Sequence, residues 1–109
     1  MLFRSNPTAV YFTPDGTKMF WTGKRTATVF SVDLATPFDV TSVNANGKTF
    51  YVGTQEAQPS GVGFSSDGRR MFVVGTRRNT VFSYELGVQW DVSTARYLGQ
   101  NIEIGRAHV

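Results

Sequence analysis

Cysteine is absent from this chain, and histidine occurs once, as His108. Without cysteine the chain has no disulfide, no thiolate metal ligand and no cysteine nucleophile. A single histidine so close to the C-terminus disfavours a Ser/His/Asp triad and a histidine-based metal site. The longest apolar stretches, such as 71–74, are far shorter than the roughly 20 residues of a membrane-spanning helix, so we expect no membrane span.

The rest of the composition favours strands over helices. Aromatic residues make up 14% of the chain, led by nine Phe, and 11 residues are Gly, a combination that suits sheets joined by tight turns. No segment shows apolar residues at helical spacing over the about ten residues that a helix needs. The net charge of +3 is weak evidence for an anionic partner, because part of it lies in the last residues of the chain.

The chain repeats itself without a gap after 52 residues, so that the segment starting at Pro7 aligns with the segment starting at Pro59. A repeat of this length is the pattern of stacked or ring-forming repeat architectures. The identical pairs include Asp15/Asp67, Gly16/Gly68, Met19/Met71, Phe20/Phe72, Gly23/Gly75, Val29/Val81, Phe30/Phe82, Leu34/Leu86, Asp39/Asp91 and Val40/Val92.

Each copy shows the period-two alternation of strands. The first two strands are separated by an Asp-Gly turn, in which glycine can adopt the positive φ that the reversal needs. The second strand is nearly all apolar, which predicts a strand covered on both faces. The predicted strands are 10–12, 18–22, 29–34 and 49–52 in the first copy and 62–64, 70–74, 81–86 and 101–104 in the second.

Four antiparallel strands repeated in tandem are how a propeller blade is built. We therefore predict an all-β fold of two four-stranded antiparallel β-propeller blades. Two blades leave apolar faces uncovered, so the chain is expected to be a partial propeller or the protomer of an oligomeric ring. The expected organisation is an N-terminal extension (1–6), blade repeat 1 (7–58), blade repeat 2 (59–104) and a tail (105–109).

The tail is expected to be non-native, because 104–109 match what one reading frame of a common sequencing adapter encodes. On this interpretation, His108 has no role in the function of the protein.

The second copy resembles a tandem β-propeller repeat of marine phage and bacterial proteins, some of them associated with virions or tails. The repeat has the form PxGhxFxxDGxKMaVxG, then xTVaxYxL, then WDVSTAxY, where h is hydrophobic and a aromatic. The first copy departs from it mildly, with Trp21-Thr22 in place of Val-Val and Phe38 in place of Trp. The chain is more distantly similar to YVTN-type propeller repeats. The matching residues are Pro59, Gly61, Phe64, Asp67, Gly68, Met71, Phe72, Val73, Gly75, Thr80, Val81, Tyr84, Leu86, Trp90, Asp91, Val92, Ser93, Thr94, Ala95 and Tyr97.

Two pairs of basic residues are the candidate ligand-binding residues. Lys24 and Arg25, and likewise Arg77 and Arg78, fall in the turn between the second and third strands of their copies. In a ring of blades these turns share one rim, so we hypothesise that they bind an acidic polysaccharide, a cell-surface glycan or nucleic acid. The simpler alternative is a solvated turn that discourages edge-to-edge aggregation.

The aspartates and loop aromatics are better explained by structure than by chemistry. Asp15 and Asp67 precede turn glycines, where Asp accepts local backbone hydrogen bonds, and an Asx-type turn is the favoured role of Asp39 and Asp91. The equivalent aromatic residues of the two copies could stack on a sugar, but packing at the blade edge is the favoured interpretation. These aromatic residues are Phe38 and Trp90.

The leading functional hypothesis is a non-catalytic module for structural assembly or adhesion in a phage virion or bacterial surface protein, located on the virion or cell surface. We expect no catalytic residue, no metal site and no cofactor, and as partners further propeller blades, in cis or by homo-oligomerisation. One alternative is a fragment of a propeller lactonase, hydrolase or quinoprotein whose active site lies in missing blades. Another is a self-assembling lectin-like ring of about six or eight blades from three or four chains.

Overall fold

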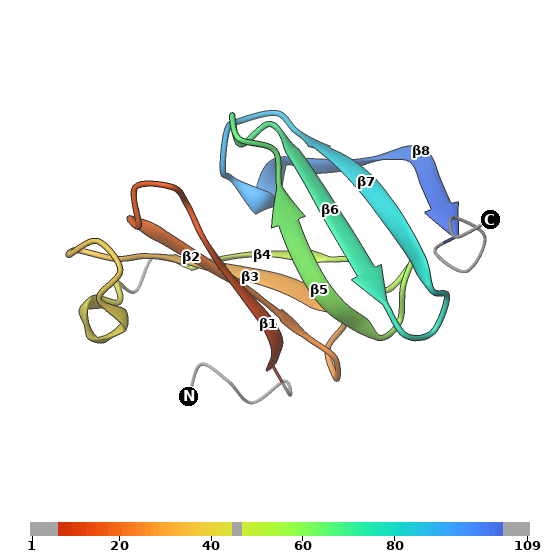
Figure 1. Ribbon diagram of the computed structural model, residues 1–109, viewed down its shortest axis with the longest axis horizontal. Coiled ribbons are helices and arrows are strands. Elements are labelled where there is room, and N and C mark those ends of the chain that lie inside the picture. Colours follow the sequence, from red (N-terminus) through yellow and green to blue (C-terminus); the bar gives the residue numbers. More distant parts are fainter. Residues whose placement is uncertain (1–6, 45–46, 104–109) are drawn as a thin grey trace.

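The computed structural model describes residues 7–44 and 47–103; the expected extension (1–6) and tail (105–109) lie outside them. The described chain is all-β, with two four-stranded antiparallel sheets consistent with two propeller blades (Figure 1). The first sheet contains β1 (Pro7–Phe12), β2 (Lys18–Gly23), β3 (Thr28–Asp33) and β4 (Lys48–Tyr51). The second contains β5 (Pro59–Phe64), β6 (Arg70–Gly75), β7 (Thr80–Leu86) and β8 (Ala95–Glu103). Short 3₁₀ helices, η1 (Val40–Ser42) and η2 (Val92–Thr94), lie before β4 and β8.

The first hairpin of each sheet turns at its Asp-Gly pair, which confirms the prediction. Gly16 has a φ of +74° and Gly68 has a φ of +73°, and glycine adopts such positive φ values without steric cost. The Asp15 carboxylate accepts hydrogen bonds from the backbone nitrogen and the hydroxyl of Thr17 at 3.0 and 2.8 Å. The bond from the Thr17 backbone is the main cause that lowers the pKa of Asp15, and a bond from the Ser65 hydroxyl lowers the pKa of Asp67.

The fourth strand of the second sheet is longer than its sequence predicts. It begins at Ala95 instead of residue 101, because Ala95 and Tyr97 already pair with Leu86 and Tyr84 of β7. The register then shifts, and Gly99, with a φ of +77°, lies at the irregularity. The chain therefore pairs with β7 directly after the 3₁₀ helix η2, and the change of register follows further along, at Gly99.

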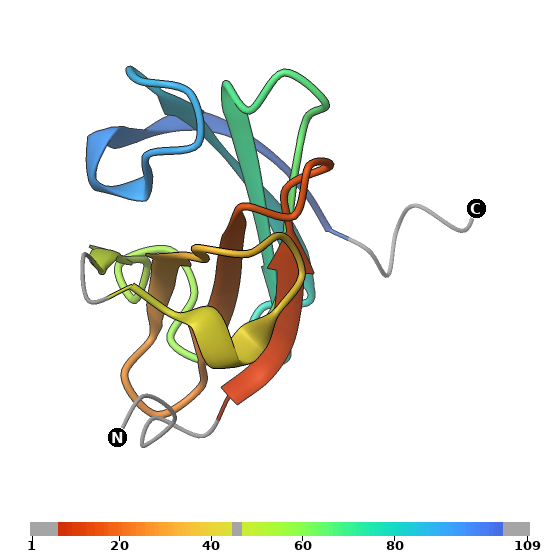
Figure 2. The same ribbon diagram turned by 90° about the vertical axis from the view of Figure 1, so that its left-hand side faces the viewer.

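The two sheets pack face to face through their inner faces, as predicted. The side chains of Phe20 and Val29 in the first sheet and of Val73 and Tyr84 in the second are 0% exposed. The ring centroids of Phe20 and Phe64 lie 4.4 Å apart across the interface. Burying each such side chain contributes about 1.5–3 kcal/mol. Figure 2 shows the sheets close together along β1 and β5 and further apart towards β4 and β8.

The outer faces of the two sheets are covered differently. On the outer face of β2, Met19 and Trp21 are buried in a second apolar cluster together with Val32 and Leu34, so β2 is covered on both faces as predicted. The same prediction is wrong for β6, because the side chains of Phe72 and Val74 are only half-buried. The first sheet covers one face of β6, and no described element covers the other.

Candidate functional site

The four predicted ligand-binding residues lie in two equivalent turns at one end of the strands. Lys24 and Arg25 lie between β2 and β3, Arg77 and Arg78 lie between β6 and β7, and all four are exposed. Both turns are on the lower side of the molecule in Figure 1. We call these four residues the basic rim. Among the described residues no hydrogen bond or ion pair joins the two turns. The turns therefore lie at the same end of the two sheets but do not form a single pocket.

A buried carboxylate holds the second of these turns. Glu56, in the segment between the sheets, is 0% exposed. Its Oε1 accepts from the backbone nitrogen of Arg78 at 3.0 Å and its Oε2 from that of Gln58 at 2.9 Å. Gly75 leaves the necessary space, since a Cβ there would lie 2.3 Å from the Glu56 Cδ. A buried carboxylate is tolerated only when it is hydrogen-bonded, so Glu56 ties the inter-sheet segment to the β6–β7 turn.

Trp90 and Phe38 occupy equivalent positions, and the structure confirms a packing role for Trp90. Its backbone has a φ of +63°, and its ring lies against Gly68, where a Cβ would be 2.3 Å from the indole Cε2. The indole also packs at 6.4 Å between ring centroids on Tyr11 of the first sheet. The ring is thus packed on Gly68 and on the first sheet, and it stays half-buried. Phe38 lies on Gly16 in the same way but is 58% exposed.

Asp91 shapes its own loop and also contacts the other sheet. Its Oδ1 accepts from the backbone nitrogen and hydroxyl of Ser93 at 3.0 and 2.6 Å, which confirms the predicted Asx-type turn. Its Oδ2 accepts from Lys48 Nζ of β4 at 2.7 Å. Burial raises the pKa of Asp91, but the bonds from Lys48 and Ser93 outweigh it and hold the pKa below its usual value. Asp39 is bonded likewise, and the hydroxyl of Thr41 is the main cause that lowers its pKa. We call Asp15, Asp39, Asp67 and Asp91 the turn aspartates.

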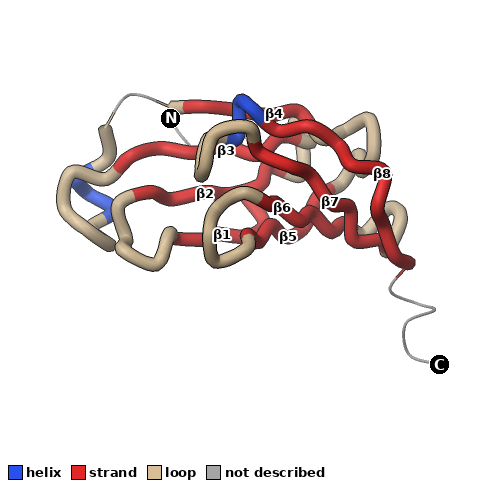
Figure 3. The backbone as a smooth tube through the Cα atoms, turned by 90° about the horizontal axis from the view of Figure 1, so that it is seen from above, coloured by secondary structure: helices blue, strands red, loops and turns tan. Residues whose placement is uncertain are grey.

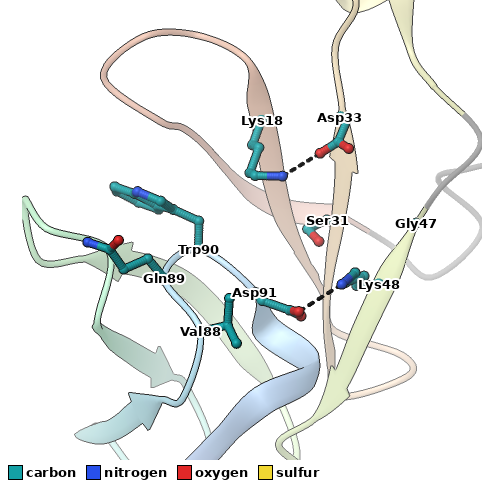
Figure 4. A pocket seen from close by; sticks show the side chains of 9 residues that line it. All are labelled: Lys18, Ser31, Asp33, Gly47, Lys48, Val88, Gln89, Trp90 and Asp91. Atoms are coloured by element: carbon teal, nitrogen blue, oxygen red, sulfur yellow. Dashed lines mark hydrogen bonds and ion pairs between the residues drawn. The ribbon is translucent and has the colours of Figure 1, made fainter.

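A cavity of about 560 Å³ opens between the sheets at the end opposite the basic rim (Figure 4). It lies at the start of β2, whereas the rim follows the end of that strand. Two ion pairs form its walls: Lys18 Nζ to Asp33 Oδ1 at 2.6 Å, and the bond from Lys48 to Asp91. Figure 3 shows η2, which follows Asp91, beside β4. This junction cavity is lined by Lys18, Ser31, Asp33, Gly47, Lys48, Val88, Gln89, Trp90 and Asp91.

The lining of the junction cavity supplies polar contacts. Each ammonium group has three N–H donors and each carboxylate several acceptor positions, so the two ion pairs leave further donors and acceptors at the wall. Such donors and acceptors suit the hydroxyl groups of a small polar ligand such as a sugar unit. The half-buried indole of Trp90 also lines the cavity and adds an apolar surface beside these polar groups.

Sequence reasoning considered Trp90 and Asp91 but missed this cavity and its other residues, although one signal was present. The basic and acidic residues Lys18 and Asp33 face each other across β2 and β3, and Arg70 and Glu85 repeat that pairing in β6 and β7. A cross-strand charge pair kept in both copies could have been read from the repeat. The bond from Lys48 to the other sheet carries no such signal, because its partner lies 43 residues away.

No protein-family model matches this chain, and no curated protein matches it either. Within residues 7–44 and 47–103, no three His, Cys, Asp or Glu side chains form a group that could hold a metal ion. In the same part of the chain no helix is long and apolar enough to cross a bilayer.

Proposed function

We propose that this chain is a non-catalytic β-propeller repeat module that serves structural assembly or adhesion, in a phage virion or a bacterial surface protein. The observation that supports it is the stacking of two equivalent sheets through apolar inner faces while apolar side chains remain exposed on the outer faces. In a propeller each blade covers a face of the next, so exposed outer faces are what such a module offers to further blades.

The basic rim is the surface proposed for adhesion. Equivalent turns recur at the same end of every blade, so each added blade adds cations to one side of the assembly. A band of like charge attracts an acidic polymer more strongly than a single turn does, and salt weakens that attraction. The hydrogen bond that Glu56 accepts from the backbone nitrogen of Arg78 holds this turn in place, so less conformational entropy is lost when a ligand binds. The proposed ligand is an acidic polysaccharide or cell-surface glycan.

Heparin binding tests the proposed adhesion. We expect retention on heparin that falls with salt and is lost when all four rim residues are replaced by alanine. A matched comparison uses Arg77→Ala/Arg78→Ala against Arg69→Ala/Arg70→Ala, since both remove two exposed charges from the second sheet but at opposite ends. If heparin retained the two double variants equally, the basic rim would not be the surface that binds the polymer. Turnover of lactones, esters or glycosides by a protein that binds no polymer would favour the enzyme-fragment alternative.

A further inference from the structure

The outer faces of the two sheets are counterparts of the inner faces that already pack together. Because the chain repeats after 52 residues, each contact between the sheets has a matching pair of positions, one on each outer face. The internal interface is therefore a template for what an outer face can bind. The template can be compared with the actual exposure of the outer residues.

The outer face of the second sheet is an uncovered copy of a buried surface. Phe20 and Val29 of the first sheet are 0% exposed beneath the second sheet. Their counterparts Phe72 and Val81 are only half-buried, and Ile102 beside them is 55% exposed. These side chains border an open cavity of about 300 Å³. We call it the groove; it is lined by Phe72, Val81, Ser83, Gln100, Asn101 and Ile102.

The outer face of the first sheet carries the matching projection. Phe38 and Val40 are 58% and 54% exposed. Their counterparts in the second sheet, Trp90 and Val92, belong to the internal interface: Val92 is 0% exposed and Trp90 packs on the first sheet. Four other apolar side chains of this outer face are buried in the second cluster, but Val10, which pairs with Trp21, is 58% exposed, so Val10 and this projection remain accessible. We call this projection the ridge; it consists of Phe38, Asp39 and Val40, together with the half-buried Phe12, whose ring centroid lies 5.7 Å from that of Phe38.

The polar groups of the two surfaces also correspond. At the internal interface Asp91 uses Oδ1 for its own turn and Oδ2 for Lys48. Asp39 likewise uses Oδ1 for its turn, and no hydrogen bond to its Oδ2 is formed by a described residue. The counterpart of Lys48 is Gln100, which lines the groove and has an amide that can donate to a carboxylate. The ridge thus presents an acceptor where the groove presents a donor.

We propose that a second copy of this chain docks its ridge into the groove of the first, head to tail, so that the interface between the two sheets recurs between chains. The inference rests on the proposed function and names the partner in assembly. Ridge and groove are different surfaces, so the contact is heterologous, and every open assembly keeps one free ridge at one end and one free groove at the other until a ring closes. Burial of the exposed Phe, Val and Ile side chains drives the association.

Sedimentation velocity of the full chain over a concentration series tests the docking. The wild-type protein is expected to associate, and Ile102→Asp in the groove and Val40→Asp in the ridge are each expected to be monomeric. An equimolar mixture of the two variants is expected to form dimers, because each supplies the surface that the other has lost. Val88→Asp is the matched control: this side chain is 57% exposed but lies at the junction cavity, and association should persist.

A gain of affinity provides a second test. Gln100→Lys would recreate between chains the ion pair that joins the sheets within one chain, with Asp39 as its partner. We expect the dissociation constant to fall about two- to fivefold, in line with a partly exposed ion pair. Asp39→Asn in the same protein should cancel the gain. Circular dichroism of each variant confirms that it is folded.

A wild-type protein that stays monomeric, variants that still associate, or a mixture that forms no dimer would each overturn the proposal. Heparin binding by the same samples separates this failure from that of the proposed function. A monomeric protein that still binds heparin would refute the docking alone. A monomeric protein that binds no polymer and turns over substrate would refute both, whereas the same protein in an associated state would refute the proposed function alone.

Discussion

The contact between Gly68 and Trp90 yields the sharpest stability prediction. Replacing Gly68 by Ala places a Cβ where the φ is +73°, which costs about 1–2 kcal/mol for an L-residue. The same Cβ would lie 2.3 Å from the indole Cε2, so the ring must leave its place between the sheets, at about 1–3 kcal/mol more. We expect Gly68→Ala to lower the free energy of unfolding by about 2–5 kcal/mol.

Two other glycines separate these costs. Gly99 has a φ of +77° but nothing within 4 Å of its Cβ position, so Gly99→Ala should cost only the conformational part, about 1–2 kcal/mol. Gly63 has no positive φ and also nothing within 4 Å, so Gly63→Ala should be neutral or stabilise by up to about 1 kcal/mol. The free energy of unfolding is therefore expected to be highest for Gly63→Ala, lower for Gly99→Ala and lowest for Gly68→Ala.

Urea denaturation followed by far-ultraviolet circular dichroism measures the series, at one protein concentration because self-association would shift apparent stability. A double-mutant cycle completes it: in a Trp90→Ala background, Gly68→Ala should cost no more than Gly99→Ala does in the wild type. If Gly68→Ala is as mild as Gly99→Ala in the wild type, or if its cost persists without the indole, the reasoning about the ring is wrong.

Three further predictions concern charged groups. Glu56→Ala leaves the backbone nitrogens of Gln58 and Arg78 without their acceptor, so it should lower the free energy of unfolding by about 2–4 kcal/mol in urea denaturation. Glu56→Gln keeps one acceptor oxygen and should lower it less. Equal losses in the two variants would show that these hydrogen bonds are unimportant. A double-mutant cycle on Lys48 and Asp91 should show a coupling of about 0.2–1 kcal/mol that disappears at about 1 M salt, and a coupling unaffected by salt would contradict an ion pair. The turn aspartates have pKa values lowered by folding, so their stabilisation is complete above the unfolded pKa of about 3.9 and is lost as the pH falls through the folded values. Unfolding free energy should therefore be nearly constant from about pH 7 to 5 and fall below about pH 4, and replacing these residues by Asn should flatten that decline.

Local chemistry made the strands and turns predictable. The Asp-Gly pairs define hairpins because a glycine at positive φ and a carboxylate that bonds its neighbours act within a few residues. The alternation along β7, where every second side chain is buried, follows from the two-residue period of an extended chain. Strand ends were less predictable, as the early start of β8 shows, because pairing with the neighbouring strand decides where a ladder resumes.

Among the candidate sites, too, some could be predicted from the sequence and others could not. The basic rim could be placed from the sequence because its residues sit in turns whose positions the repeat reveals. Glu56 could not be recognised as a buried carboxylate, because its burial depends on how the segment between the sheets folds back over Gly75. The junction cavity and the bond from Lys48 to Asp91 exist only because two sheets meet at a particular angle and separation.

The amino-acid sequence by itself determined that this protein consists of two equivalent antiparallel sheets, since periodicity and turn chemistry are local properties shared by both copies. The tertiary structure alone decided which faces are covered. Phe20 and Phe72 occupy the same position in the repeat, yet Phe20 is 0% exposed and Phe72 is only half-buried. Burial depends on the neighbour that lies against a sheet, and a pattern common to both copies does not contain that neighbour.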